Sequence, residues 1–165
     1  MKIAVFPGTF DPITLGHIDI IERGLQIFDK IYIAVGVNPK KSTFFPLEKR
    51  IEWLNSLFEN NHQIIVESYT GLTVDFCKAV NANFVLRGLR SFEDFEYEKR
   101  IAYVNKELMP NLESVFLFSA VNYGNVSSSL VREVLSCGGN INGFVPKKVV
   151  EEIAKLSKAE NQQSL

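Results

Sequence analysis

The chain lacks the features that would place it in a disulfide-rich or metal-clustered class. Its 165 residues contain only two cysteines, Cys77 and Cys137, which lie far apart and form no CxxC pair. A disulfide framework and a zinc-binding pattern are therefore not indicated. We expect both cysteines to be small core residues in a reducing compartment, and we expect no metal-ligating residues.

Long hydrophobic runs and an excess of positive charge are also missing. No run approaches the roughly 18 apolar residues that a membrane span needs, and Pro7 and Gly8 break the first apolar run too early for a signal peptide. We therefore expect a cytoplasmic protein with no membrane partner. The net charge is −1, so general nucleic-acid binding is not expected. This charge does not exclude a local basic pocket for a small phosphorylated ligand.

The sequence alternates patterns typical of strands with patterns typical of helices, as α/β proteins do. A length of 165 residues favours one domain, with 46% hydrophobic residues to form its core. Apolar, β-branched runs predict strands at 3–6, 31–37, 62–68, 83–86 and 114–118. Helical patterns fall between and after them, at 18–28, 46–58, 72–80, 92–108, 127–135 and from 146 onward. This alternation predicts a doubly wound, five-stranded parallel sheet in a domain spanning 1–157, followed by a disordered tail at 158–165.

Polar residues suited to phosphate follow four of the predicted strands. They are Thr9, His17, Lys40, Lys41, Arg87, Arg90, Ser127, Ser128 and Ser129. In open α/β sheets, ligands bind beyond the carboxyl ends of the strands. We therefore expect these residues, distant in sequence, to meet in one crevice.

The segment Pro7–His17, PGTFDPITLGH, is the most informative stretch. It joins a predicted strand to a predicted helix through a turn that contains glycine and proline. His17 falls where the helix should begin, beside free backbone N–H groups and the positive end of the helix dipole. Such a histidine can donate to a phosphate, whereas His62 resembles an ordinary surface residue.

Two later motifs also have a structural and a functional interpretation. In RGLR (87–90), the planar guanidinium groups of the arginines can each donate two hydrogen bonds to a phosphate, and the glycine allows a ligand to approach the backbone closely. The acidic residues that follow would by default form a solvated helix face, and Ser91 with Asp94 resembles a capping box. Serines 127–129 could simply cap a helix, but three in a row before Arg132 also suit phosphates.

These motifs together resemble a known enzyme family. Thr14-Leu15-Gly16-His17 is similar to the (T/H)xGH signature of the nucleotidyltransferase superfamily, and Val126–Arg132 resembles its second signature. The longer PGTFDPITLGH string, with RGLR and the FEYE of residues 95–98, resembles the phosphopantetheine adenylyltransferase family. The resemblance covers the chain from Ile3 to about Leu156 and implies a Rossmann-like nucleotidyltransferase fold.

The resemblance implies an activity in coenzyme A biosynthesis. Such an enzyme transfers AMP from ATP to 4′-phosphopantetheine, which gives dephospho-coenzyme A and pyrophosphate. It also implies Mg²⁺ accompanying ATP, carried mostly by phosphates and water, feedback inhibition by coenzyme A, and a homohexamer. The helix at 92–108 has apolar residues on more than one face, which is compatible with burial against a partner.

The resemblance also assigns roles to individual residues. Catalytic roles fall to His17, Lys41 and Arg90. Contacts with the acceptor substrate fall to Thr9, Lys41, Thr73 and Arg87. Contacts with the nucleotide fall to Thr9, Phe10, His17, Gly88, Leu89, Arg90, Glu98, Tyr123, Gly124, Asn125, Val126, Ser127, Ser128 and Ser129.

Two alternatives remain open at the level of the sequence. The superfamily motifs also suit a cytidylyltransferase or a nicotinate-mononucleotide adenylyltransferase. A nucleotide-sensing protein without turnover would keep Ser127–Ser129 but tolerate the loss of His17. Product analysis with each acceptor distinguishes these two transferases from a phosphopantetheine adenylyltransferase. Pyrophosphate release distinguishes an enzyme from a sensor.

Overall fold

Five parallel strands form the centre of the molecule. The computed structural model describes residues 1–40 and 42–163. The sheet has the order β3-β2-β1-β4-β5, which confirms the doubly wound α/β prediction. The strands are β1 (Ile3–Gly8), β2 (Lys30–Gly36), β3 (Ile64–Tyr69), β4 (Phe84–Leu89) and β5 (Glu113–Phe118). Strand order reverses between β1 and β4, which is where such sheets open a crevice.

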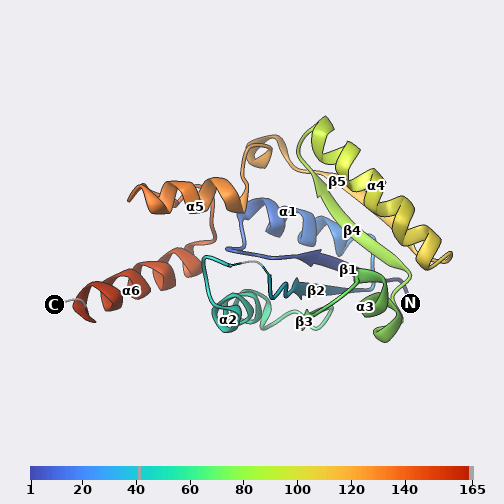
Figure 1. Ribbon diagram of the computed structural model, residues 1–165, viewed down its shortest axis with the longest axis horizontal. Coiled ribbons are helices and arrows are strands. Elements are labelled where there is room, and N and C mark those ends of the chain that lie inside the picture. The colour runs from blue at the N-terminus through green and yellow to red at the C-terminus, as the bar shows by residue number, and fades with distance from the viewer. Residues whose placement is uncertain (41, 164–165) are drawn as a thin grey trace.

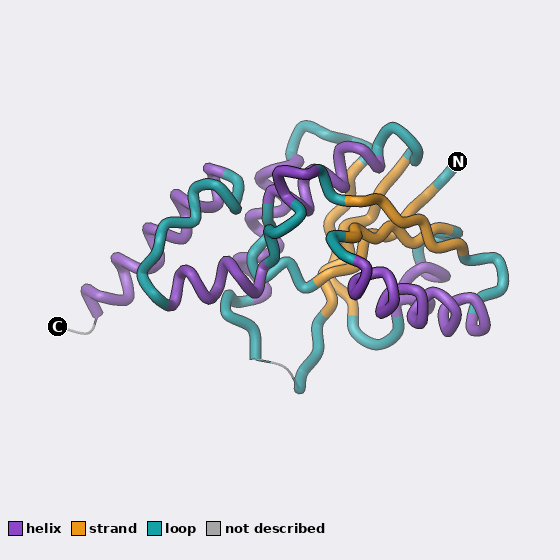
Figure 2. Tube along the Cα trace, turned by 90° about the horizontal axis from the view of Figure 1, so that it is seen from above, coloured by secondary structure: helices purple, strands orange, loops and turns teal. Residues whose placement is uncertain are grey.

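Helices cover both faces of this sheet (Figure 2). They are α1 (Leu15–Gly24), α2 (Leu47–Phe58), α3 (Thr73–Ala79), α4 (Phe92–Leu108), α5 (Ser128–Ser136) and α6 (Lys147–Gln163), with a short 3-10 turn, η1, at Val121–Tyr123. Successive strand residues point to opposite faces. Phe6 of β1 therefore joins Ile20 and Trp53 in the core under α1 and α2, whereas Val5 joins Val74 in the core under α3.

Several boundaries differ from those expected from the sequence, and two of them concern the site. The first helix spans Leu15–Gly24 rather than 18–28, because Thr14 caps it earlier. Strand β4 continues past 86 to Leu89, since Arg87 to Leu89 pair with β5, so Arg87 lies within the strand and not after it. Helix α6 spans Lys147–Gln163, and the domain end at 157 with a tail at 158–165 stays a prediction. Figure 1 shows α6 reaching away from the sheet.

The two cysteines occupy different environments. Cys77 is buried in the core under α3, and its burial raises the pKa of its thiol to about 11. Cys137 caps the end of α5 and is exposed, so the prediction that both cysteines are core residues was wrong for this one. Its helix ends at the surface before Gly138, which leaves the side chain no core to enter.

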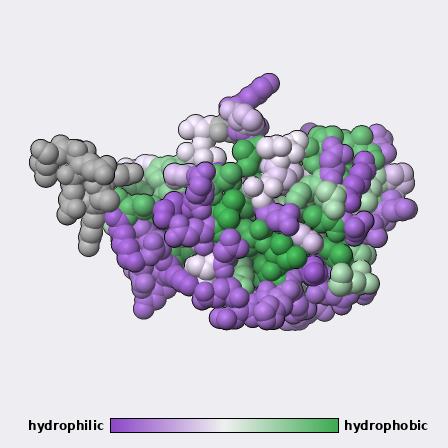
Figure 3. Space-filling view, turned by 90° about the horizontal axis from the view of Figure 1, so that it is seen from below, coloured by the Kyte–Doolittle hydropathy of each residue, from purple (hydrophilic) through white to green (hydrophobic). Residues whose placement is uncertain are grey.

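The surface carries several hydrophobic side chains. Those on α4 are Phe92, Tyr97, Tyr103, Val104 and Leu108. Hydrophobic side chains also gather over the middle of the face seen in Figure 3, bordered by hydrophilic ones. Among the described residues, no helix combines the length and apolar character that crossing a membrane requires.

Candidate active site

Two adjoining cavities open at the carboxyl ends of β1 and β4. The first, of about 390 Å³, brings together the segments that the sequence placed at one rim of the sheet. Its walls include Thr9, Phe10, His17, Arg87, Gly88, Arg90, Glu98, Val126, Ser127, Ser128 and Ser129. The second, of about 300 Å³, extends under α4 and contains Thr73. Pro7, Gly8, Thr9, Arg87 and Glu98 line both cavities and so mark their junction.

His17 is held in one orientation by the cap of its own helix. The backbone N–H of Thr14 donates to Nδ1 of His17 at 3.0 Å, while the Thr14 side chain accepts from the backbone N–H of His17. Since Nδ1 is the acceptor, the neutral ring carries its proton on Nε2. Burial, and then the charges of Arg90 and Arg87, lower the pKa of His17 to about 4. At neutral pH the imidazole is therefore an uncharged hydrogen-bond donor.

Phe10 packs against this imidazole from the preceding turn. Its backbone has a φ of 48°, a left-handed conformation that is costly for a bulky residue. Its ring lies 5.1 Å from that of His17, centroid to centroid, and is only 2% exposed. A Cβ on Gly8 would come within 2.9 Å of the Phe10 ring, so the turn requires a glycine there. Phe10 thus packs on the imidazole and also lines the first cavity, and its contact with a nucleotide stays a prediction.

The low pKa of His17 predicts a pH dependence of stability. The folded-state pKa is about 4, against 6.5 for an unperturbed histidine, so the unfolded chain binds more protons between these values. The stability of the wild type should therefore fall as pH drops from 6.5 toward 4. Urea unfolding of wild type and His17→Asn should show their difference in unfolding free energy shrinking across this window. A difference that stays constant would contradict the assignment of a neutral, buried imidazole.

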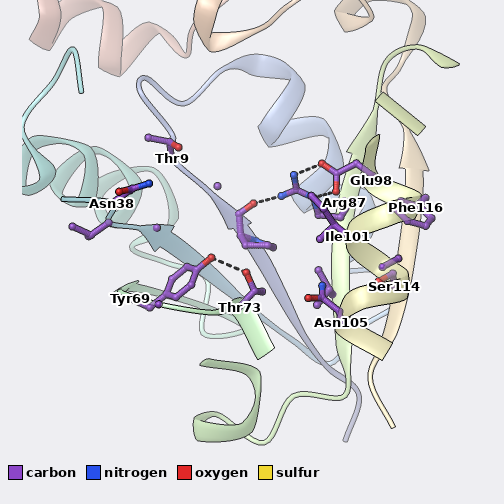
Figure 4. Close-up of a pocket in the computed structure, with 17 residues that line it drawn as sticks. Thr9, Asn38, Tyr69, Thr73, Arg87, Glu98, Ile101, Asn105, Ser114 and Phe116 are labelled. Atoms are coloured by element: carbon purple, nitrogen blue, oxygen red, sulfur yellow. Dashed lines mark hydrogen bonds and ion pairs between the residues drawn. The ribbon is translucent and has the colours of Figure 1, made fainter. Parts of the chain in front are cut away.

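Both arginines of the RGLR motif are paired with carboxylates of α4. Nε and Nη2 of Arg87 donate to the two carboxylate oxygens of Glu98, as Figure 4 shows. Nη1 of Arg87 donates to the carbonyl of Pro7. Nε and Nη2 of Arg90 donate to Asp94 at 2.9 and 3.1 Å. Burial opposes the ionisation of Asp94, but the hydrogen bonds and charge of Arg90 outweigh it and lower its pKa.

These pairings go beyond what the sequence indicated. Ser91 caps α4 as expected by accepting from the backbone of Asp94, yet the Asp94 carboxylate binds Arg90 rather than completing a capping box. Glu98, expected to contact the nucleotide, has its carboxylate engaged by Arg87. The available signal was the spacing of Asp94 and Glu98, which places them on one face of the helix.

The hydroxyls of the three serines are largely used within the protein. Ser127 accepts from the backbone of Leu130 and caps α5, Ser128 donates to the carbonyl of Pro12 at 2.8 Å, and Ser129 accepts from Arg132. The backbone N–H groups of Ser128 and Ser129 belong to the first turn of α5, where no intrahelical acceptor exists. Both residues line the first cavity, and a helix start of this kind suits a phosphate.

Several other predicted residues lie apart from the cavities or serve packing. A Cβ on Gly88 would lie 2.9 Å from Ile20, so this glycine makes room for α1 rather than for a ligand alone. Leu89 is buried in the core, with 1% of its surface exposed. The segment 123–125 lines neither cavity. Lys41 lies outside the residues that the structure describes.

The second cavity has mixed walls that the sequence did not reveal. Figure 4 shows the hydroxyl of Tyr69 pointing toward that of Thr73, at 2.9 Å, across from Asn105 on α4. Asn105 is 9% exposed, and Ile101 and Phe116 add apolar surface beside it. Apolar walls with a few amide and hydroxyl groups suit an extended organic chain that contains amides. In the sequence, the one signal for these mixed walls is the spacing of Ile101 and Asn105, which places both on one face of the helix.

The described carboxylates that line the cavities, and Asp11 in the turn after β1, are engaged by donors of the protein itself. Asp94 and Glu98 are bound by arginines, and Asp11 accepts from the backbone N–H groups of Phe44 and Phe45. Across residues 1–40 and 42–163, no group of three potential ligands is placed to hold an ion. The donor set therefore does not fit a metal held by the protein alone.

Comparisons of the sequence and of the fold with known proteins identify the family of this chain. A model described as cytidylyltransferase-like matches residues 5–134. The phosphopantetheine adenylyltransferase of Clostridium botulinum (strain Alaska E43 / Type E3) is 46% identical over 96% of this chain and 99% of its own length. That of Christiangramia forsetii is 49% identical over 90% and 98%. A putative nicotinate-nucleotide adenylyltransferase from Vibrio parahaemolyticus shares the fold, with a TM-score of 0.73 at 19% identity over 94% and 93% of the two chains. The chain belongs to the phosphopantetheine adenylyltransferase family within the cytidylyltransferase-like superfamily.

Proposed function

We propose that this enzyme transfers AMP from ATP to 4′-phosphopantetheine, forming dephospho-coenzyme A and pyrophosphate. The observation that carries the proposal is the junction of the two cavities at Thr9 and Arg87. The first cavity offers helix N–H groups and cationic side chains for a triphosphate. The second offers amide, hydroxyl and apolar groups for a pantetheine arm, so the acceptor phosphate would reach the junction.

The chemistry requires alignment and charge stabilisation more than a base. The acceptor phosphate is already an anion, and one of its oxygens attacks the α-phosphorus of ATP while the bond to the bridging oxygen of pyrophosphate breaks. Arg87 and Thr9 position the attacking phosphate. The Nε2–H of His17 and the guanidinium of Arg90 stabilise charge on the α-phosphate. The first turn of α5 holds the departing phosphates, and we assign Lys41 to the same charge stabilisation from the family resemblance.

Mg²⁺ enters this proposal with the nucleotide. Mg²⁺ keeps several waters and binds readily to substrate phosphates, so it needs few protein ligands. The arginine-bound carboxylates of Asp94 and Glu98 agree with that division of roles. When bound, the ion would neutralise part of the triphosphate charge. Coenzyme A carries the same pantetheine arm as the acceptor, and we include it as an inhibitor that competes for the second cavity.

The direct test is a coupled pyrophosphate assay with identification of the product. With ATP, 4′-phosphopantetheine should give pyrophosphate and dephospho-coenzyme A, whereas nicotinate mononucleotide should give neither. Use of CTP in place of ATP tests the cytidylyltransferase alternative. If nicotinate mononucleotide released pyrophosphate from ATP and 4′-phosphopantetheine did not, the proposed acceptor would be wrong. If no acceptor released pyrophosphate, a nucleotide sensor would be favoured.

The outer face of α4 supports a proposal on assembly. We propose a homohexamer in which this face contacts another copy, because Tyr97 and Tyr103 are each 65% exposed and Val104 is 54% exposed. Light scattering should give the mass of a hexamer for the wild type. Val104→Glu should give a smaller species, while Ile27→Glu, also at an exposed apolar residue, should not. A stable wild-type monomer at assay concentration would overturn this proposal.

A further inference from the structure

Two carboxylates of α4 face the two arginines that flank Gly88 and Leu89. Asp94 and Glu98 are one helical turn apart, so they project from the same side of the helix. Both line the first cavity together with the arginines that they bind. A role for these carboxylates rests on the proposed function, because it concerns how this site holds its phosphates.

Three hydrogen bonds to two partners hold the Arg87 guanidinium in place. Glu98 receives two of its N–H groups and the Pro7 carbonyl receives a third, so the guanidinium is held against both β1 and α4. One N–H remains on each terminal nitrogen for an oxygen of a ligand. The carboxylate of Glu98 is only 9% exposed, so this pairing is sheltered from water. Figure 4 shows the pair at the wall of the second cavity.

Arg90 is fixed in a similar way but closer to solvent. Asp94 accepts from the backbone N–H of Arg90 as well as from its Nε and Nη2 groups. The side chains of Arg90 and Asp94 are 37% and 26% exposed, more than those of the Arg87 pair at 27% and 9%. The contribution of Asp94 should therefore be smaller than that of Glu98.

We propose that Glu98 and Asp94 are positioning residues, with Glu98 aiming Arg87 at the acceptor phosphate and Asp94 aiming Arg90 at the α-phosphate. A bidentate carboxylate fixes the plane of a guanidinium and the direction of its remaining N–H groups. An arginine without this support keeps its charge but must be ordered when the ligand binds. In this arrangement neither carboxylate needs to touch the triphosphate, which would repel an unpaired negative charge.

The proposal predicts separate effects for two matched variants. Glu98→Gln should raise the KM for 4′-phosphopantetheine about tenfold, the scale of a lost charge-assisted hydrogen bond, with the KM for ATP nearly unchanged. Asp94→Asn should lower kcat severalfold with little change in either KM. Glu96→Gln is the control, since Glu96 lies on the same helix but pairs with Lys99 and lines neither cavity. It should behave as the wild type.

Two further measurements separate positioning from direct contact and from loss of structure. In the Arg87→Lys background, Glu98→Gln should cause little additional loss, because both changes remove the same pairing. In calorimetry, Glu98→Gln should weaken binding of 4′-phosphopantetheine but leave pantetheine, which lacks the phosphate, unaffected. Equal weakening of both ligands would show a structural role and overturn the proposal, as would a rise in the KM for ATP matching that for the acceptor.

The same calorimetry distinguishes this proposal from the proposed function. If the wild type binds 4′-phosphopantetheine but releases no pyrophosphate, the transferase function fails while the role of Glu98 is still measured by binding. If the wild type turns over and Glu98→Gln binds the acceptor as tightly as the wild type, the function stands and the positioning role is overturned.

Discussion

His17→Ala is expected to lower kcat by roughly 100-fold or more, which is the scale of losing one preorganised donor to a developing charge. The imidazole is neutral at working pH and presents its Nε2–H because Thr14 occupies Nδ1. Removal of the ring also leaves a void beside Phe10. Because the donor acts mainly in the transition state, the KM for ATP should change far less than kcat.

The control for this variant is the other histidine. His62 is exposed and lies before β3, so His62→Ala should keep wild-type turnover. Steady-state pyrophosphate release and thermal unfolding should be measured on both variants, so that a loss of folding is not mistaken for a loss of catalysis. Turnover by His17→Ala near that of the wild type would refute the role given to His17.

Asp11→Ala is expected to cost about 3 kcal/mol of unfolding free energy, because it leaves two backbone donors without acceptors. The carboxylate of Asp11 is 3% exposed and accepts from Phe44 at 2.7 Å and from Phe45 at 2.8 Å. Arg50 reinforces the same junction by donating to the carbonyls of Phe45 and Thr9. The variant should therefore also loosen the turn that carries Thr9.

Urea unfolding of a matched variant checks the reason for this effect. Asp29 is exposed and accepts one hydrogen bond from the backbone of Lys2, at 2.6 Å. Asp29→Ala should cost less than about 1 kcal/mol, because water can replace its carboxylate. Equal losses for the two variants would mean that burial of the acceptor is not what makes Asp11 important.

The fold and the rim of the site could be predicted because they follow from local patterns. Apolar strands that alternate with helices dictate a parallel sheet, and that sheet gathers the ends of its strands at one edge. His17 and Arg90 were therefore expected to meet, and the charge of Arg90 contributes to the low pKa of His17.

What could not be predicted depends on partners distant in sequence. Ser128 resembles a phosphate ligand in the sequence, but its hydroxyl binds the carbonyl of Pro12, on a turn that only the fold brings near. Glu98 resembles a solvated or nucleotide-binding residue until β4 is seen to extend through Arg87. Periodicity identifies the face on which a residue lies, but not the group that it meets there.

A crystal structure with bound dephospho-coenzyme A would test the central claim most directly, because this product should span both cavities. We predict the pantetheine arm beside Tyr69 and Asn105, and the diphosphate between His17 and Arg87 at the junction of the cavities. An arm bound outside the cavity under α4, or a diphosphate beyond hydrogen-bond reach of both His17 and Arg87, would contradict it.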